Sequence, residues 1–223
     1  MSTDIKTWLD FTRQQMAAES YLDQFTLQGV PLQQVLIDGN NDRRVIPVGD
    51  FTGKTQFTDL QAQQFTQRYQ ILDHHANDAT GFSATLMQER DAQGNLTNNF
   101  TLSFRSTESK VHDEGGDWER DGSSGADGEI TLEGFAFGQL ASMETYYQSL
   151  KNSGLLPADA VLNVTGYFLG GHLATVFTEL HASDVNQTYL FNAAGRGPFT
   201  VVLSSESAQT PRLRKTNLER IAA

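Results

Sequence analysis

Hydrophobic residues along this chain recur with two spacings, which divide it into helices and strands. Apolar side chains at every third or fourth position indicate amphipathic helices, and the segments with this pattern are 8–25, 60–71, 135–150 and 171–180. Short apolar runs bounded by turn residues indicate strands, and these are 33–37, 44–48, 82–87, 100–104, 160–165 and 189–192. Glycine-rich acidic sequence at 113–129 predicts a loop.

The order of these elements predicts the fold class. A turn cluster at 91–95 joins two strands into a hairpin, and strand, helix, strand, helix, strand then follow as far as 192. This order is typical of an α/β fold, with a mostly parallel central sheet and crossover helices on both faces. The chain has no internal repeat and no low-complexity linker, so we expect one domain. Its parts are a lead-in at 1–80, a core at 81–200 and a tail at 201–223.

Composition and charge exclude several classes of partner and site. The formal net charge of −11 argues against nucleic acid and anionic membrane surfaces as partners, because the long-range field repels phosphates. The chain has no cysteine, which excludes disulfides, thiolate metal sites and cysteine nucleophiles. No apolar run approaches the roughly 18 residues of a membrane-spanning helix. The amino terminus does not resemble a signal peptide. The sequence is therefore compatible with the cytosol and with export by a route that uses no amino-terminal signal.

The segment with the most specific chemistry is Val164-Thr-Gly-Tyr-Phe-Leu-Gly-Gly171. A serine in place of Phe168 would make it Gly-x-Ser-x-Gly, the nucleophile elbow that lifts a serine hydroxyl above the end of a sheet. The turn is strained, and a bulky residue tolerates its positive φ poorly. Two interpretations of Phe168 remain: a core residue that fills the place of the substrate acyl carbon, or a wall of an apolar groove.

Further segments resemble class 3 lipases. Phe104-Arg-Ser-Thr-Glu108 resembles the family's Phe-Arg-Gly-Thr-Glu segment, and it precedes the elbow by about sixty residues, as in the family. Residues 134–135, 166–174 and 191–195 match in the same order, so the resemblance covers roughly 80–200. It is greatest to bacterial lipases and phospholipases whose longer relatives carry glycine-rich calcium repeats. The resemblance implies an α/β-hydrolase fold, with the last strands missing here, and hydrolysis of carboxylic esters in lipids.

The resemblance also assigns roles to residues. Thr107 and Leu169 would supply the two backbone amides of an oxyanion hole, while Phe168 occupies the nucleophile position and is not competent. Glu133 stands where the family has a histidine, and no histidine follows His181. The chain as written is therefore expected not to hydrolyse esters.

Two acids follow the elbow without matching the family's acid segment. Asp184 lies at the end of the elbow's own helix, and Glu206 is better spaced but has no familiar surroundings. The expectation is either an amino-terminal portion of a longer hydrolase or a pseudoenzyme. The alternative function is a non-catalytic module that binds a lipid or acyl group. A third interpretation is an inactive fragment whose open sheet edge drives self-association.

We expect no required cofactor, and calcium is the metal ion that the sequence suggests. Asp117, Glu119 and Asp121, followed by Gly122, imitate the start of a calcium loop, but the acid that should close the loop falls one place late at Glu129. Calcium binding competes with a solvated acidic loop or a lid over the site. A two-histidine metal site at 74–75 is disfavoured, because adjacent side chains point in different directions.

Overall fold

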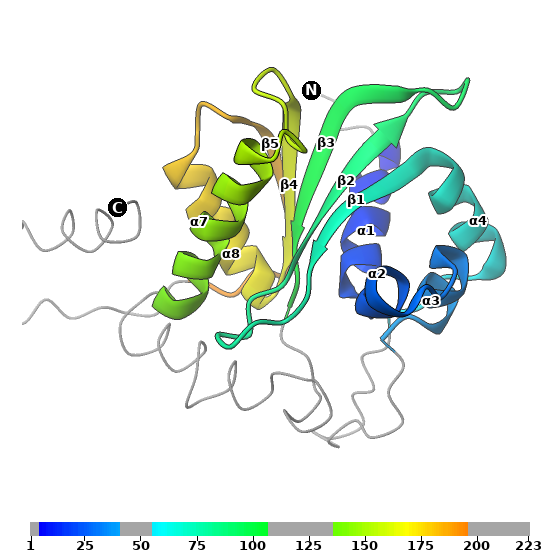
Figure 1. Cartoon of the computed structure of the whole chain (residues 1–223), viewed down its shortest axis with the longest axis horizontal. Coiled ribbons are helices and arrows are strands. Elements are labelled where there is room, and N and C mark those ends of the chain that lie inside the picture. Colours follow the sequence, from blue (N-terminus) through cyan, green and yellow to red (C-terminus); the bar gives the residue numbers. More distant parts are fainter. Residues whose placement is uncertain (1–4, 41–54, 107–135, 196–223) are drawn as a thin grey trace, which may run out of the picture.

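The computed structural model describes residues 5–40, 55–106 and 136–195, and a five-stranded sheet lies at their centre (Figure 1). The strands, in their order across the sheet, are β1 (Tyr69–His75), β2 (Ala84–Arg90), β3 (Leu96–Phe104), β4 (Val161–Tyr167) and β5 (Val185–Phe191). β1, β2 and β3 pair antiparallel, whereas β3, β4 and β5 pair parallel. The fold is of the α/β class with a mixed sheet, so the expected parallel arrangement holds for only part of it.

Helices cover both faces of the sheet (Figure 1). One face carries α7 (Phe137–Asn152) and α8 (Leu169–Leu180). The other face carries α1 (Ile5–Glu19), with α2 (Asp23–Gln28), α3 (Leu32–Asp38) and α4 (Asp59–Arg68) beside it. Within the described ranges, no helix has the length and apolar content needed to cross a membrane.

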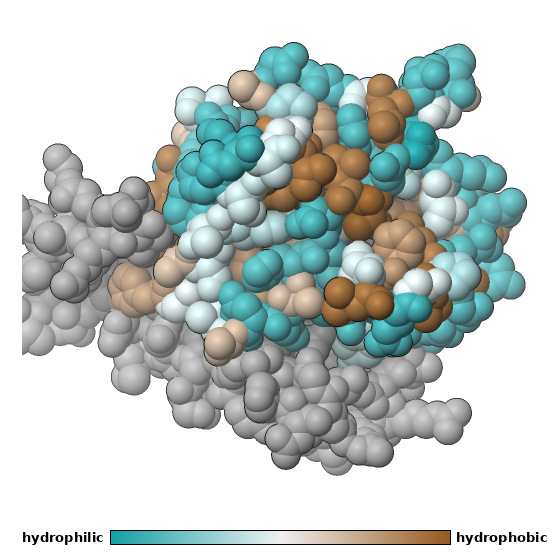
Figure 2. Space-filling model, in the orientation of Figure 1, coloured by the Kyte–Doolittle hydropathy of each residue, from teal (hydrophilic) through white to brown (hydrophobic). Residues whose placement is uncertain are grey.

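The main hydrophobic core lies between the sheet and α7 and α8. Alternate residues of the strands point into it, among them Phe100, Leu102 and Phe104 of β3 and Leu162 and Val164 of β4. A second cluster, which includes Phe57, Phe65, Tyr69 and Met87, packs α1, α3 and α4 against β1 and β2. On the surface, the described residues show hydrophobic patches interrupted by hydrophilic ones (Figure 2).

The opposite side of β3 and β4, which faces α1, is polar. Thr101 and Ser103 of β3 pair with Asn163 and Thr165 of β4, and each is at most 7% exposed. β1, β3, β4 and β5 run in the same direction, so their carboxyl ends meet at one edge of the sheet. This is the edge at which open α/β sheets bind ligands.

Several predicted elements are confirmed and others are wrong. The hairpin turn at 91–95, the helix before Gly154, and β4 and α8 lie where the sequence predicted them. The strand predicted at 189–192 also exists, but β5 begins four residues earlier, at Val185. The predicted strand at 33–37 is instead α3, whose Val35 and Leu36 pack in the second cluster. The predicted helix at 60–71 ends at Arg68, and the chain continues as β1, which pairs with β2. Segment 8–25 contains two helices, and 44–48, 113–129 and 201–223 lie outside the described residues.

Candidate functional site

The elbow lies between β4 and α8, with Phe168 at its apex. Phe168 has φ 47° and ψ −113°, a sparsely populated conformation for a bulky side chain. Its N–H donates to the Phe191 carbonyl at 3.2 Å, and its carbonyl accepts bonds from the N–H groups of Gly171, His172 and Ala194 at 3.0, 3.2 and 2.8 Å. These bonds hold the turn against the end of β5, so the strained conformation is fixed by its surroundings.

The glycines around the turn allow backbones to approach closely. A Cβ on Gly166 would lie 2.1 Å from the Gly170 carbonyl oxygen, and a Cβ on Gly170 would lie 2.3 Å from the Phe104 carbonyl oxygen. A Cβ on Gly171 would lie 2.5 Å from that of Ala193. No larger residue fits at these three positions without a shift of the backbone.

The elbow exposes one side chain and buries the next. The Phe168 residue is 38% exposed, so its ring is not a fully buried core group, whereas Leu169 is 1% exposed. The Leu169 N–H is the first amide of α8, and no hydrogen bond to it occurs within the described part of the chain. Such unpaired amides at a helix amino terminus attract anions and carbonyl oxygens.

The end of β3 lies directly against the elbow. Besides the Phe104 carbonyl, the Arg105 carbonyl oxygen would lie 2.8 Å from a Cβ on Gly170. The sequence-predicted segment 104–108 and the elbow are therefore brought together as far as Ser106, where the described range ends. Thr107 is the next residue and lies outside that range.

A buried polar network, which sequence reasoning missed, holds this end of β3 to α1. Gln15 Nε2 donates to the Phe104 carbonyl at 2.9 Å and to the Glu19 carboxylate at 2.7 Å. The same carboxylate accepts the Ser106 N–H at 3.1 Å, and the Glu19 carbonyl accepts Arg105 Nη2 at 3.3 Å. Glu19 is 8% exposed. Nothing local in the sequence signals a contact between residues 87 positions apart.

The same network reaches β4. The Thr165 hydroxyl lies 2.7 Å from both Gln15 Oε1 and the Ser103 hydroxyl. Thr165 precedes the elbow by three residues, and it is fully buried. The approach of β4 to the turn is thereby fixed on the α1 side by hydrogen bonds and on the α8 side by apolar packing.

Of the two histidines in or next to α8, one is paired with an acidic side chain and the other is buried. His181 Nε2 lies 2.7 Å from Glu144 Oε2, and its ring packs on Tyr147 and Phe177. Since α8 rises about 1.5 Å per residue, His181 is roughly 20 Å along the helix from the elbow. The His172 side chain, by contrast, is 1% exposed within the fold.

The two adjacent histidines of β1 have different surroundings, as the sequence predicted. Burial, aided by the charges of Arg105 and His75, lowers the pKa of His74 to about 3, and its Nδ1 lies 3.0 Å from the Thr85 hydroxyl. His75 packs instead on the rings of Phe82 and Tyr146. Over the described ranges, no group of three or more histidine or acidic side chains has a metal-binding arrangement.

The remaining candidates are far from the elbow or outside the described residues. Asp184 precedes β5, at the end opposite the elbow, where it accepts bonds from the Tyr147 hydroxyl at 2.6 Å and Lys151 Nζ at 3.3 Å. The hydrogen bond from Tyr147 is the main reason that the pKa of Asp184 is lowered. Asp117, Glu119, Asp121, Glu133 and Glu206 lie outside the described residues.

Comparison with protein-family models, curated proteins and solved structures finds no match for this chain.

Proposed function

We propose that this chain is a lipase-like α/β-hydrolase that binds a lipid ester or fatty acid at its elbow without hydrolysing it. The observation that carries the proposal is the backbone of Phe168, with φ 47° and ψ −113° between a parallel strand and a buried helix. A Gly-x-Ser-x-Gly elbow requires this kind of sharp, strained strand-to-helix turn. The close glycine contacts and the likeness of 104–108 to class 3 lipases support the same proposal.

The chemistry proposed for the site is binding through backbone amides. In a serine hydrolase the elbow hydroxyl attacks the ester carbon while two amides stabilise the oxyanion, and loss of one such donor costs about 3 kcal/mol. The Leu169 amide has no hydrogen-bond partner in the described part of the chain, so it is available for a carbonyl or carboxylate oxygen. The family resemblance proposes Thr107 as the second donor. The benzyl group of Phe168 has no atom that can attack an ester.

The proposal also rests on the positions of the described bases. His181, at the end of α8, is paired with Glu144 of α7, and the side chain of His172 is buried. A hydroxyl without a base beside it is a poor nucleophile. We therefore expect that Phe168→Ser alone does not create an activated serine, and that the variant does not react with a fluorophosphonate probe. Labelling of that serine, detected by mass spectrometry, would show that a base lies within reach and contradict the expectation.

The deciding experiment measures binding and turnover together. The purified chain should bind a dansyl-labelled fatty acid and should not release p-nitrophenol from short- or long-chain esters beyond a heat-denatured blank. Phe168→Asn and Phe168→Asp form a matched pair, since both residues tolerate positive φ and they differ mainly in charge. In the Asp variant, the introduced carboxylate would repel a fatty-acid carboxylate bound at the Leu169 amide by about 1.4 kcal/mol. Fatty-acid binding should therefore be about tenfold weaker than in the Asn variant. Equal affinities, or hydrolysis by the wild-type chain, would refute the proposal.

A second candidate concerns the edge of the sheet. Among the described strands, β5 pairs only with β4, and Leu190 on it is 38% exposed. An unpaired edge is a template for association with another chain, so self-association through β5 is the alternative proposal. Light scattering tests it: a concentration-dependent rise in mass supports association, and a constant monomer mass excludes it.

A further inference from the structure

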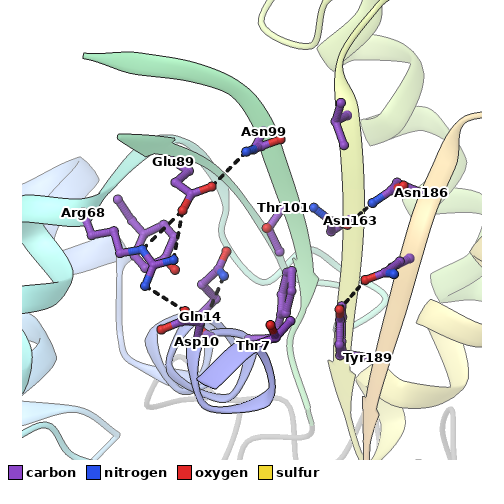
Figure 3. Close-up of a pocket in the computed structure, with 14 residues that line it drawn as sticks. Thr7, Asp10, Gln14, Arg68, Glu89, Asn99, Thr101, Asn163, Asn186 and Tyr189 are labelled. Atoms are coloured by element: carbon purple, nitrogen blue, oxygen red, sulfur yellow. Dashed lines mark hydrogen bonds and ion pairs between the residues drawn. The ribbon is translucent and has the colours of Figure 1, made fainter. Parts of the chain in front are cut away.

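A polar cavity lies at the opposite end of the sheet from the elbow. It has a volume of about 240 Å³ and lies between α1 and residues in the middle of β3, at the start of β4 and in the first five positions of β5 (Figure 3). Amide, hydroxyl and carboxylate side chains from several elements surround it. Typical small-molecule and cofactor pockets are larger, at roughly 300–1,000 Å³, and are lined mostly by apolar side chains. This cavity is therefore suited to a small polar ligand.

A row of polar residues across three strands forms one wall. Thr101, Asn163 and Gln187 pair in register across β3, β4 and β5, so their side chains share one face of the sheet. Thr101 is 5% exposed and Asn163 is 7% exposed. Gln14 of α1, which is 3% exposed, lines the cavity as well.

Part of this wall has unused hydrogen-bonding capacity. Within the described ranges, no hydrogen bond reaches the Thr101 hydroxyl or Gln14 Oε1, and the bond from Asn163 Nδ2 to the Phe100 carbonyl is long, at 3.5 Å. These groups line the open cavity and are not sealed in the protein interior. Such groups persist where a ligand or ordered water completes their bonds. The next row, Ser103 and Thr165, already has hydrogen bonds within the protein, so on the α1 side of β3 and β4 the unused groups are those that line the cavity.

An irregularity in β5 adds a further amide to the wall. Leu162 pairs with Val185 and Asn163 with Gln187, so Asn186 is an extra residue in the ladder. Consecutive strand residues normally point to opposite faces, but a bulge changes this direction. Asn186 and Gln187 both line the cavity, and Asn186 Nδ2 donates to Asn163 Oδ1 at 2.9 Å (Figure 3).

The charges at the cavity disfavour an anionic ligand. Arg68 lies 2.7 Å from Asp10 and 3.0 Å from Glu89, and Asn99 donates to Glu89 at 3.0 Å (Figure 3). The one arginine is thus shared by two carboxylates, which leaves this group of side chains with a formal charge of −1. Phosphates and carboxylates would meet repulsion there. Both carboxylates already have partners, which argues against a metal ion.

We propose that this cavity binds a neutral polyhydroxylated ligand of monosaccharide size. Carboxamides and hydroxyls both donate and accept hydrogen bonds, as neighbouring sugar hydroxyls require. Phe11, Tyr69 and Tyr189 also line the cavity and provide apolar surface for the C–H groups of a sugar ring. The proposal stands independently of the elbow, because the two sites lie at opposite ends of β3, β4 and β5.

The test is saturation-transfer NMR and titration calorimetry on the full chain. The probes are the methyl glycosides of glucose, galactose, mannose and N-acetylglucosamine, with maltose, lactose and chitobiose as oligosaccharide counterparts. We expect at least one neutral sugar to bind, and glucuronic acid to bind more weakly than the glucoside. A disaccharide that binds more tightly than its methyl glycoside identifies a glycan end as the ligand, whereas equal affinity identifies the free sugar. Absence of binding by every neutral sugar, or preference for glucuronic acid, overturns the proposal.

Variants locate the binding in the cavity. Thr101→Val keeps the side-chain shape and removes the hydroxyl, so the affinity should fall about fivefold, the equivalent of one neutral hydrogen bond. The exposed Asn186→Ala should act in the same direction with little risk to folding. Thr188→Val is the control, because its hydroxyl lies on the other face of β5, 2.6 Å from Thr178 of α8. Equal losses in the control and in Thr101→Val would contradict binding at this cavity.

Discussion

The strain at the elbow predicts a reversal in the usual order of alanine and glycine. Phe168→Ala and Phe168→Gly remove the same ring, so the loss of its packing is nearly common to both variants. The two variants differ in how well the residue tolerates the backbone conformation at this position, which has φ 47° and ψ −113°. Glycine adopts positive φ without a steric penalty, whereas alanine keeps the Cβ that causes the strain.

The expected difference follows from two opposing effects. A side chain held in a sparsely populated conformation costs roughly 1–3 kcal/mol. Glycine, through its greater freedom in the unfolded chain, is normally less stable than alanine by roughly 0.5–1 kcal/mol. At position 168 the strain is the larger effect, so the glycine variant should be more stable than the alanine variant by about 1 kcal/mol. For a protein of this size, that corresponds to about 2–4 °C in Tm.

The assay is urea and thermal unfolding followed by circular dichroism. Tyr167, one residue earlier in β4, is the matched control: it is 36% exposed, close to the 38% of Phe168, and lies in a regular strand. There the alanine variant should be more stable than the glycine variant by roughly 0.5–1 kcal/mol. If alanine is also the more stable residue at position 168, the strained turn is not present and the proposal of an elbow loses its basis.

Four further changes test packing and hydrogen bonding beside the turn, a glycine of α7 for comparison, and one titrating group. Gly170→Ala would place a Cβ 2.3 Å from the last carbonyl of β3 and should lower the free energy of unfolding by roughly 1–3 kcal/mol. By contrast, Gly138→Ala in α7, where the nearest atom is 3.6 Å away, should raise it by roughly 0.5–1 kcal/mol. Glu19→Ala leaves the buried Ser106 N–H without its acceptor and should cost roughly 1–3 kcal/mol; an unchanged urea midpoint would contradict that contact. The pKa of His74 is about 3 in the folded chain, against 6.5 for an ordinary histidine, so between these two pH values the unfolded chain binds more protons than the folded chain. Stability should therefore fall as pH drops below 6.5, by up to about 1.4 kcal/mol per pH unit, and His74→Gln should flatten that slope.

Local signals predicted the elements around the elbow. The spacing of Gly166, Gly170 and Gly171 is a local requirement of the turn, and β4 and α8 flank it as short, strongly apolar segments. The hairpin turn at 91–95 was predictable for the same reason: the Asp91 carboxylate accepts the N–H groups of Gln93 and Asn95 within the turn itself.

Tertiary contacts decided the elements that sequence reasoning missed. A short apolar run such as 33–37 fits a helix or a strand equally well, and its packing with Phe57 and Phe65 makes it a helix. The strand β1 depends on its pairing with β2, and the sequence after Arg68 does not by itself indicate this pairing. The polar row that lines the cavity, Thr101, Asn163 and Gln187, depends on the register between three separate strands. No single segment of the sequence therefore predicts it.

Under the proposed function, the turn at Phe168 has the backbone geometry of a nucleophile elbow without its nucleophile. In an active hydrolase, strain at the nucleophile is part of the machinery, and loss of the nucleophile removes the reason for it. Here the conformation at Phe168 persists because bonds from Gly171, His172 and Ala194, together with the close glycine contacts, determine the turn independently of the side chain at its apex. One substitution can therefore remove the attacking atom without relaxing the scaffold. The Leu169 amide stands at the start of α8 whatever side chain precedes it, and it is the donor that the proposed binding of a carbonyl or carboxylate requires.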